Sequence, residues 1–315
     1  MIEDKGLNYG IIGNCKSSAL INEDSSIDWC CLPQFDSSAV FCKIIDEKIG
    51  GSFKIEVDKS YVITQHYINN TAILKTKFRN NENEFEVLDF MTRFKLDDQN
   101  FYNPPELQRM IRPLKGIPKI KVLYNPTLEY ANGKTKTYEK EDFIVSVFEE
   151  ASYETLFLYT DIEKNKILKN IEFELTTPVY LNLSYNEKID VPTLKKSNLE
   201  LEKTKEYWLN WCKKGPKYSL YNDEVKRSAI TLKLLTFEKT GAVLAAATTS
   251  IPETIGEVRN WDYRFCWIRD ASMVIKIIAK LGHERIVKNF IDFIVNLIPN
   301  KNEKLQIMYG IDGQK

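Results

Sequence analysis

Histidine, paired cysteines, long apolar runs and an excess of charge are scarce or missing in this chain of 315 residues. Its two histidines, His66 and His283, lie far apart, and its six cysteines show no Cys-x-x-Cys spacing. A zinc site is therefore not expected, and a disulfide framework is equally unexpected in a chain of this length. We expect buried, reduced thiols, with no metal and no cofactor.

Charge of one sign does not accumulate either. Lys plus Arg and Asp plus Glu each number 44, so the formal net charge is zero and offers no field to attract nucleic acid or anionic lipid. No apolar run reaches the roughly 18 residues of a membrane-spanning helix. The polar, acidic first residues lack the basic start and apolar core of a secretory signal. We expect a cytoplasmic protein without nucleic-acid or membrane partners.

Residues 1–192 have the pattern of β-structure. Short apolar runs, such as those at 9–13 and 85–90, are separated by turn residues such as Asn132-Gly133, and residues 73–78 alternate with period two. Many short strands at this spacing predict an antiparallel β-sandwich domain.

The pattern changes to helical from residue 193 onward. Residues 193–215 predict a linker helix that ends at Gly215-Pro216. In residues 216–315, apolar spacing predicts helices at 222–240, 262–281 and 284–298. Such helices must pack together to bury their apolar stripes, and three are too few to close a large core. We expect this helical part to be incomplete.

The segment 258–272, VRNWDYRFCWIRDAS, carries the clearest chemical signal. It holds four aromatic residues, three arginines and two aspartates. Carbohydrate sites use this mixture, because an aromatic ring covers the apolar face of a sugar while Arg and Asp bind the hydroxyls at its rim. Arg269 presents several donors and Asp270 accepts from vicinal hydroxyls. The alternative is an ion-pair cluster with core tryptophans that only holds structure together.

This segment resembles the first sugar-binding motif of glycoside hydrolase family 15, particularly its prokaryotic glucoamylase and trehalase branch. The approach at 240–253, the opening run at 9–41, the sandwich segment at 110–126 and the closing IMYGIDG at 307–313 are similar to that branch as well. The resemblance covers essentially the whole chain, in order.

The resemblance implies a β-sandwich, a linker and the first helices of an (α/α)6 barrel whose loops form a pocket for a terminal glucose. By matching position, Arg269 and Asp270 would hold the glucose hydroxyls, Tyr263 would lie beside the reacting ring, and Trp267 would line the pocket. Trp261 and Asp262 match the motif but would equally buttress the loop.

Two pairs in the opening run, Asp28-Trp29 and Phe35-Asp36, are further candidates for the pocket mouth. Their alternative role is packing between the two parts of the chain.

The family inverts configuration with a carboxylic acid and a carboxylate base about 6.5–9.5 Å apart. The resemblance places both beyond IMYGIDG, so we expect no catalytic residue here and no activity of this chain alone. We expect it to be the product of a truncated or split gene, or to act with a second chain that completes the barrel. Glu253 and Glu257 lie near the motif, but nothing in the sequence pairs them.

The first hypothesis is an exo-acting α-glucosidase, a glucoamylase that releases glucose from α-1,4-glucans such as maltooligosaccharides. A trehalase of the same family is the second. A carbohydrate-binding or assembly module without catalysis, or a nonfunctional remnant, is the third.

Overall fold

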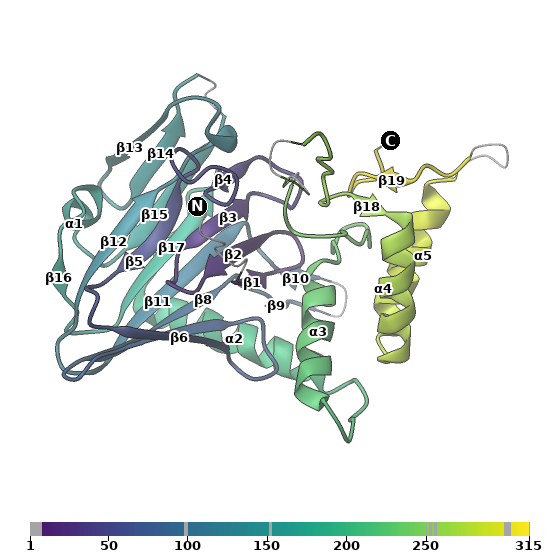
Figure 1. Ribbon diagram of the computed structural model, residues 1–315, viewed down its shortest axis with the longest axis horizontal. Coiled ribbons are helices and arrows are strands. Elements are labelled where there is room, and N and C mark those ends of the chain that lie inside the picture. The colour runs from purple at the N-terminus through teal and green to yellow at the C-terminus, as the bar shows by residue number, and fades with distance from the viewer. Residues whose placement is uncertain are drawn as a thin grey trace.

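The computed structural model describes residues 8–97, 100–150, 153–249, 251, 254, 257–298 and 304–314. Two antiparallel β-sheets come first in the chain, and helices follow beside them (Figure 1). The predicted order, a β-sandwich followed by helices, is confirmed; closure of the helices into a barrel stays a prediction.

The N-terminal sheet has seven strands in the order β1-β2-β3-β5-β12-β16, with β4 paired to β3. Their bounds are β1 (Tyr9–Gly13), β2 (Ser18–Asn22), β3 (Ile27–Cys31), β4 (Ala39–Phe41), β5 (Ser52–Glu56), β12 (Lys119–Asn125) and β16 (Phe173–Glu174).

The eight-stranded sheet has the order β13-β14-β15-β17-β11-β8-β7-β6. Its strands are β6 (Val62–Tyr67), β7 (Leu74–Arg79), β8 (Glu84–Phe90), β11 (Glu106–Lys115), β13 (Thr135–Glu139), β14 (Ile144–Phe148), β15 (Thr155–Thr160) and β17 (Val179–Tyr185). A hairpin of β9 (Phe94–Lys95) and β10 (Phe101–Tyr102), the turn η1 (Glu129–Ala131) and the short helix α1 (Lys164–Leu168) complete the β part.

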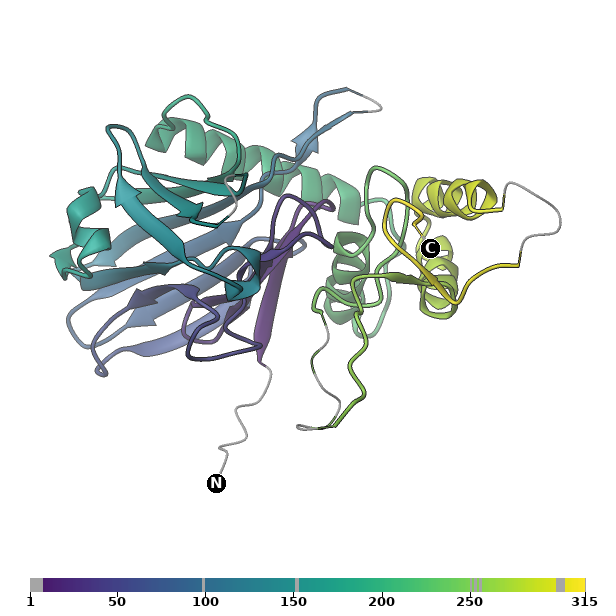
Figure 2. The ribbon, with the colours of Figure 1, turned by 90° about the horizontal axis from the view of Figure 1, so that it is seen from above.

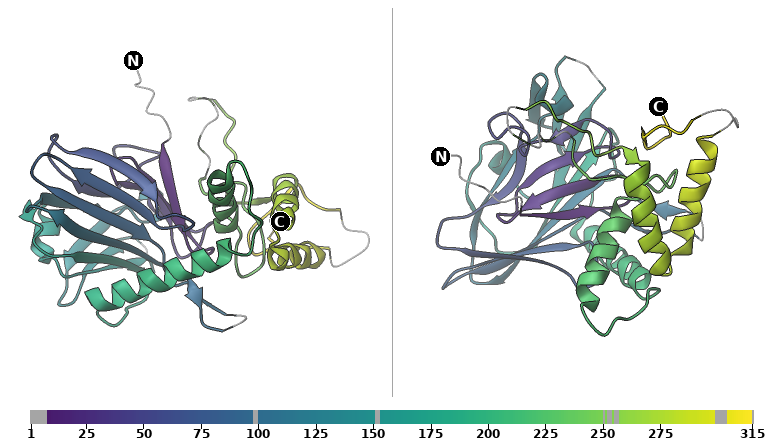
Figure 3. Two further views of the ribbon diagram at one scale, coloured as in Figure 1. Left: turned by 90° about the horizontal axis from the view of Figure 1, so that it is seen from below. Right: turned by 45° about the vertical axis from the view of Figure 1, so that its right-hand side comes forward.

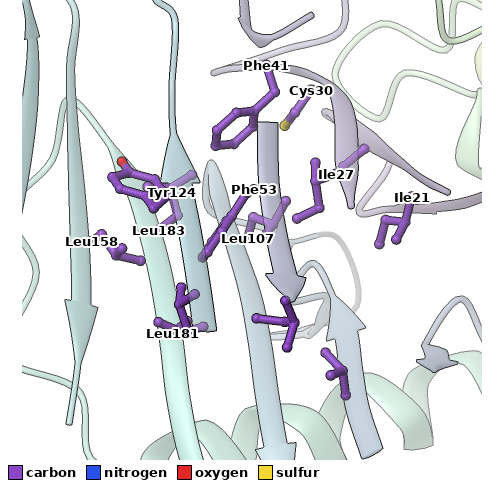
Figure 4. Close-up of a cluster of buried hydrophobic side chains, with 14 of the residues drawn as sticks. Ile21, Ile27, Cys30, Phe41, Phe53, Leu107, Tyr124, Leu158, Leu181 and Leu183 are labelled. Atoms are coloured by element: carbon purple, nitrogen blue, oxygen red, sulfur yellow. The ribbon is translucent and has the colours of Figure 1, made fainter. Parts of the chain in front are cut away.

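The core lies between the two sheets, and Figure 4 shows part of it as a cluster of buried apolar side chains. Phe53 and Ile27 come from the N-terminal sheet, and Leu107, Leu181 and Leu183 from the eight-stranded sheet. Each buried side chain of this size contributes about 1.5–3 kcal/mol relative to exposure to water. The period-two pattern in the sequence is the cause of this layering.

A buried arginine joins the sheets. Arg109 on β11 lies opposite Asp89 on β8, and its Nε donates to Asp89 Oδ1 at 2.7 Å. Its other nitrogens donate to the carbonyl oxygens of Phe53 at 2.5 Å and Ser25 at 2.6 Å, in the N-terminal sheet and its β2–β3 turn. Because both charges are fully buried, these hydrogen bonds are what makes their burial tolerable.

The predicted linker helix exists as α2 (Leu194–Cys212). Thr193 caps its N-terminus, and the Thr193 side chain accepts from the backbone N–H of Lys196. It runs along the outer face of the sandwich toward the remaining helices (Figures 2 and 3). Leu201 packs with Met110 and Phe90 of the eight-stranded sheet, while Trp208 packs with Ile230 of α3 (Asn222–Leu234). The helix therefore contacts both parts of the chain.

Two further helices follow α3, namely α4 (Ile268–Lys280) and α5 (Glu284–Asn296). The predictions of 222–240 and 262–281 were too long. α3 ends at Leu234, after which Thr236 pairs with Val243 in a returning loop. Residues 262–267 stay outside α4 because the Asp262 side chain accepts from the Arg264 backbone N–H and Trp267 is extended.

Each of the six cysteines is buried with a free thiol, as expected. None of the helices in the described part of the chain combines the length and the apolar character that a membrane span requires. In the same residues, no group of three or more His, Cys, Asp or Glu side chains is placed to hold a metal.

Beneath α2, the outer face of the eight-stranded sheet buries two carboxyl groups. Glu106 on β11 accepts from Asn182 at 3.1 Å, and Glu200 on α2 accepts from Thr92 at 3.3 Å and from Gln108. Burial, with a smaller contribution from the Glu200 charge, raises the pKa of Glu106 to about 7. Burial therefore favours the protonated form of Glu106 in the folded chain.

We predict that stability falls as pH rises from about 5 to 8. The folded-state pKa of Glu106 is raised above its unfolded value, so its contribution is complete below the unfolded pKa and is lost as pH passes the folded one. The variant Glu106→Gln removes this dependence and gains on the order of 3 kcal/mol over the wild type at pH 8. Urea denaturation across pH measures this, with Glu202→Gln on the exposed side of α2 as control. Parallel pH profiles for wild type and Glu106→Gln would contradict it.

Candidate functional site

The segment singled out in the sequence forms a loop and the start of α4. Cys266 and Trp267 form the short strand β18 (Cys266–Trp267), which pairs antiparallel with β19 (Met308–Tyr309). The backbone N–H of Ile268 donates to Ile307 O at 3.1 Å. This two-stranded ribbon lies at the N-terminal end of α4 (Figure 1), so the residues that begin the helix are fixed from two sides.

Arg269 and Asp270 sit in the first turn of α4, and they contact each other. Arg269 donates to Asp270 Oδ2 from Nη2 at 2.9 Å and from Nε at 3.2 Å. The side chain of Arg269 is 67% exposed and that of Asp270 36% exposed. The pair is thus in contact with solvent rather than packed inside the fold, and a surface ion pair of this kind contributes little to stability.

Aromatic rings flank this pair. The guanidinium of Arg269 lies 5.7 Å from the centre of the Trp267 ring, and Trp261 meets Trp267 edge-on with centroids 6.3 Å apart. Tyr263 is half-buried, and its carbonyl oxygen accepts from the Ala246 backbone N–H at 2.8 Å. The structure therefore brings together donors, an acceptor and two indole rings at one end of α4. Such a set is able to bind the hydroxyls and the apolar face of a sugar.

Asp262 faces inward from the same loop. Arg264 binds it bidentately, with Nε to Oδ1 at 3.0 Å and Nη2 to Oδ2 at 2.7 Å, and Thr249 donates to Oδ2 at 3.2 Å. Burial alone would lower the pKa of the Arg264 guanidinium, but its hydrogen bonds to Asp262 and nearby charges raise that pKa above its ordinary value. Arg264 stays charged, and in this structure Asp262 is engaged in holding the loop.

The opening run reaches this loop by packing. Trp29 is fully buried, and its indole N–H donates to Ala247 O at 2.8 Å. Phe35 is buried against Phe237, with ring centroids 6.3 Å apart. Burial raises the pKa of the half-buried Asp36 carboxyl. Trp29 and Phe35 thus make packing contacts with the helical part, while a role at a pocket mouth stays a prediction.

A cavity of about 810 Å³ lies elsewhere, between the β9–β10 hairpin, α2 and the turn from α4 to α5. Its lining residues include Phe101, Tyr207, Trp211 and His283. The rings of Trp211 and His283 stack, with centroids 3.9 Å apart. Lys233 also lines the cavity and pairs with Glu238, with Nζ 3.3 Å from Oε2. The predicted sugar-binding residues are not among its lining residues.

Of the two carboxylates near the motif, Glu253 lies outside the described residues, as do Ser250 and Pro252 of the approach segment. Glu257 is exposed, and its backbone N–H donates to Thr254 O at 3.0 Å.

The sequence interpretation missed Arg264. It lies within the motif and was counted among its three arginines, but only the fold reveals that it reaches the sandwich. The alternation of charged and aromatic residues in 258–272 gave no sign of which arginine turns inward.

Comparison with protein families gives two matches. Residues 7–160 match the family described as "Trehalase-like, N-terminal", and residues 219–315 match "Glycosyl hydrolases family 15".

Three curated proteins illustrate the similarity to individual relatives. The chain is 32% identical to a protein named trehalase from Thermoplasma volcanium, over 96% of this chain and 49% of that protein. It is 32% identical to a trehalase from Thermoplasma acidophilum, over 93% and 51% of the two chains. It is 28% identical to a trehalase from Mycobacterium tuberculosis, over 98% and 49%. The chain spans about half the length of the curated relatives it matches.

The geometry of the loop predicts which tryptophan meets solvent. Trp261 is 47% exposed, whereas Trp29 and Trp208 are fully buried. The variant Trp261→Phe should lower acrylamide quenching of the intrinsic fluorescence more than the control Trp211→Phe, whose ring is covered on one face by His283. Unchanged quenching after Trp261→Phe would show that this side chain is covered.

Proposed function

The chain belongs to glycosyl hydrolase family 15, and on that premise we propose that it supplies the sugar-binding part of a trehalase, which hydrolyses α,α-trehalose to glucose. The proposal is supported by the name trehalase on each of the three relatives described above, matched over at least 93% of this chain. Trehalase, the second hypothesis from the sequence, is thereby favoured over glucoamylase. The substrate is then a disaccharide of two glucose units rather than an α-1,4-glucan.

The observation that carries the proposal is the grouping of Arg269, Asp270 and Trp267 at the solvent-facing start of α4. A glucose ring laid against the Trp267 indole would place its equatorial hydroxyls beside the Arg269 donors and the Asp270 acceptor. The two side chains already share hydrogen bonds, so sugar hydroxyls replace water around a pair that is set in position. Tyr263 and Trp261 supply the neighbouring surface in this proposal.

Hydrolysis with inversion needs a general acid and a general base on opposite sides of the glycosidic bond, with room for one water between. We assign neither to a described residue of this chain. We propose that both carboxylates come from polypeptide outside these 315 residues, as a continuation or as a second chain.

The exposed apolar faces of α4 and α5 support the proposal that further polypeptide packs against this chain. Met273 and Ile277 on α4, and Ile291 and Val295 on α5, are 46–63% exposed and lie one helical turn apart in each helix. Apolar stripes of this kind usually mark a surface that another element covers. Further helices packed here would extend the helical part toward the (α/α)6 barrel. The division into 1–192, 193–215 and 216–315 is retained as part of this proposal.

We predict that the purified chain binds trehalose and that Arg269→Ala weakens this binding by at least about tenfold. Loss of a charged hydrogen-bond donor costs about 1.5–3 kcal/mol, which sets that factor. Isothermal titration measures it, with Arg79→Ala, an exposed arginine on β7, as the matched control.

Each further outcome of that titration has a defined meaning. Tighter binding of maltose than of trehalose would favour a glucoamylase. Trehalose affinity that Arg269→Ala leaves unchanged would contradict the site, and no affinity for either sugar would contradict the sugar-binding function. Binding that never leads to turnover when the missing half is supplied would favour a carbohydrate-binding module.

The exposed faces of α4 and α5 predict a complex with the half of a trehalase that this chain does not span. Mixing the chain with that half of the Thermoplasma volcanium protein should give a one-to-one complex that releases glucose from trehalose. The variant Met273→Asp, with a charge in the apolar stripe, should weaken the complex, whereas Lys276→Asp on the same helix serves as control. Native mass spectrometry detects the complex, and a glucose assay measures the hydrolysis of trehalose. Absence of a complex would show that the apolar faces have another role.

A further inference from the structure

Arg264 lies where the sandwich and the helical part meet, and it is buried to 7% exposure. Its Nη1 donates to Ser37 O at 2.9 Å, to the Tyr130 hydroxyl and, more weakly, to Cys31 Sγ at 3.6 Å. These acceptors belong to three segments of the sandwich, namely the loop after β3, η1 and β3 itself. The end of one guanidinium is therefore enclosed by the sandwich.

The other edge of the same guanidinium faces the sugar-binding loop. Nε and Nη2 bind both carboxylate oxygens of Asp262, and the Asp262 carbonyl accepts from the Trp267 indole N–H at 3.3 Å. Trp267 in turn lies under the Arg269 guanidinium, which donates to Asp270. Consecutive contacts thus run from the sandwich through Arg264 and Asp262 to the proposed sugar-binding side chains.

The sandwich presents Tyr130 from a strained turn. Glu129, Tyr130 and Ala131 have positive φ values of 52°, 57° and 59°, although none is glycine. Each such residue costs roughly 1–2 kcal/mol, and runs of them persist only where the surroundings fix them. Here Ser38 donates to Glu129 at 2.8 Å, and the Tyr130 hydroxyl donates to Ser37 O at 3.2 Å while accepting from Arg264. The strained turn thus places the Tyr130 hydroxyl against the Arg264 guanidinium.

We propose that Arg264 is a positioning residue, through which the β-sandwich fixes the loop 262–267 and hence the sugar-binding residues at the start of α4. This role rests on the proposed sugar-binding function, since it concerns the geometry of that site. It also assigns the sandwich a role in substrate binding although none of its residues need touch the sugar. Lysine cannot replace this arginine, because a single ammonium does not span the Asp262 carboxylate and the sandwich acceptors together.

The test compares Arg264→Lys with Arg227→Lys. Arg227 on α3 also joins the helical part to the sandwich, by donating to Thr71 O at 2.8 Å, but it lies outside the series of contacts that reaches Trp267. Amide hydrogen exchange of residues 257–267 should rise by about tenfold or more in Arg264→Lys and stay unchanged in Arg227→Lys. Trehalose affinity should fall by about tenfold in the first variant only.

Tyr130→Phe provides a milder variant should Arg264→Lys fold poorly. It removes the hydroxyl that accepts from Arg264 and donates to Ser37 O, and it leaves the other acceptors of Arg264 in place. Loop exchange should therefore rise less, and affinity fall less, than in Arg264→Lys. In the double variant the two effects should not add, because both act through one contact.

Unchanged loop exchange in Arg264→Lys would overturn the proposal. Raised exchange with unchanged trehalose affinity would overturn it as well, since Arg264 would then support only the fold. If the wild type itself fails to bind trehalose, the proposed function fails, while the exchange data still decide whether Arg264 holds the loop.

Discussion

The guanidinium of Arg264, held between the Asp262 carboxylate and the sandwich, determines where the loop before α4 can lie. A buried charge of this kind is tolerated only when its donors are matched by acceptors in fixed positions. Those acceptors are a carbonyl and a hydroxyl of the sandwich and a carboxylate of the loop. Moving the loop away from the sandwich would therefore separate the Arg264 charge from its partners, so this one side chain couples the two parts of the chain.

The sandwich is suited to act as the fixed side of this contact. Its two sheets share a continuous apolar core, and Arg109 adds hydrogen bonds from β11 to β5 and to the β2–β3 turn. Trp29 provides a second contact between the sandwich and the helical part. Its ring is buried in the sandwich, and its indole N–H donates to the carbonyl oxygen of Ala247. Loops carried by a rigid scaffold hold their side chains more accurately than loops alone. The sugar site proposed at the start of α4 depends on that accuracy.

Local patterns in the sequence predict those features that depend on short-range chemistry. Alternation in 73–78 appears as strand β7, and the linker helix ends at Cys212, three residues before Gly215 and close to the predicted boundary. The grouping of Arg269 with Asp270 and Trp267 was also accessible, since these residues are neighbours in the chain. The limits of the helices could not be predicted in this way. The start of α4 is set by hydrogen bonds of Asp262 and by the pairing of Trp267 with Met308, which is about forty residues further along the chain. The inward turn of Arg264 was equally hidden, since its partners Ser37 and Tyr130 are more than 130 residues distant.

The central claim, that trehalose binds at the start of α4 within a loop fixed by Arg264, is tested most directly by a crystal structure of the chain grown with trehalose. The account predicts difference density for a glucose ring against Trp267, with hydroxyls within hydrogen-bond distance of Arg269 and Asp270. Density for the sugar in the cavity of about 810 Å³ beside Trp211 and His283, with the start of α4 empty, would contradict it.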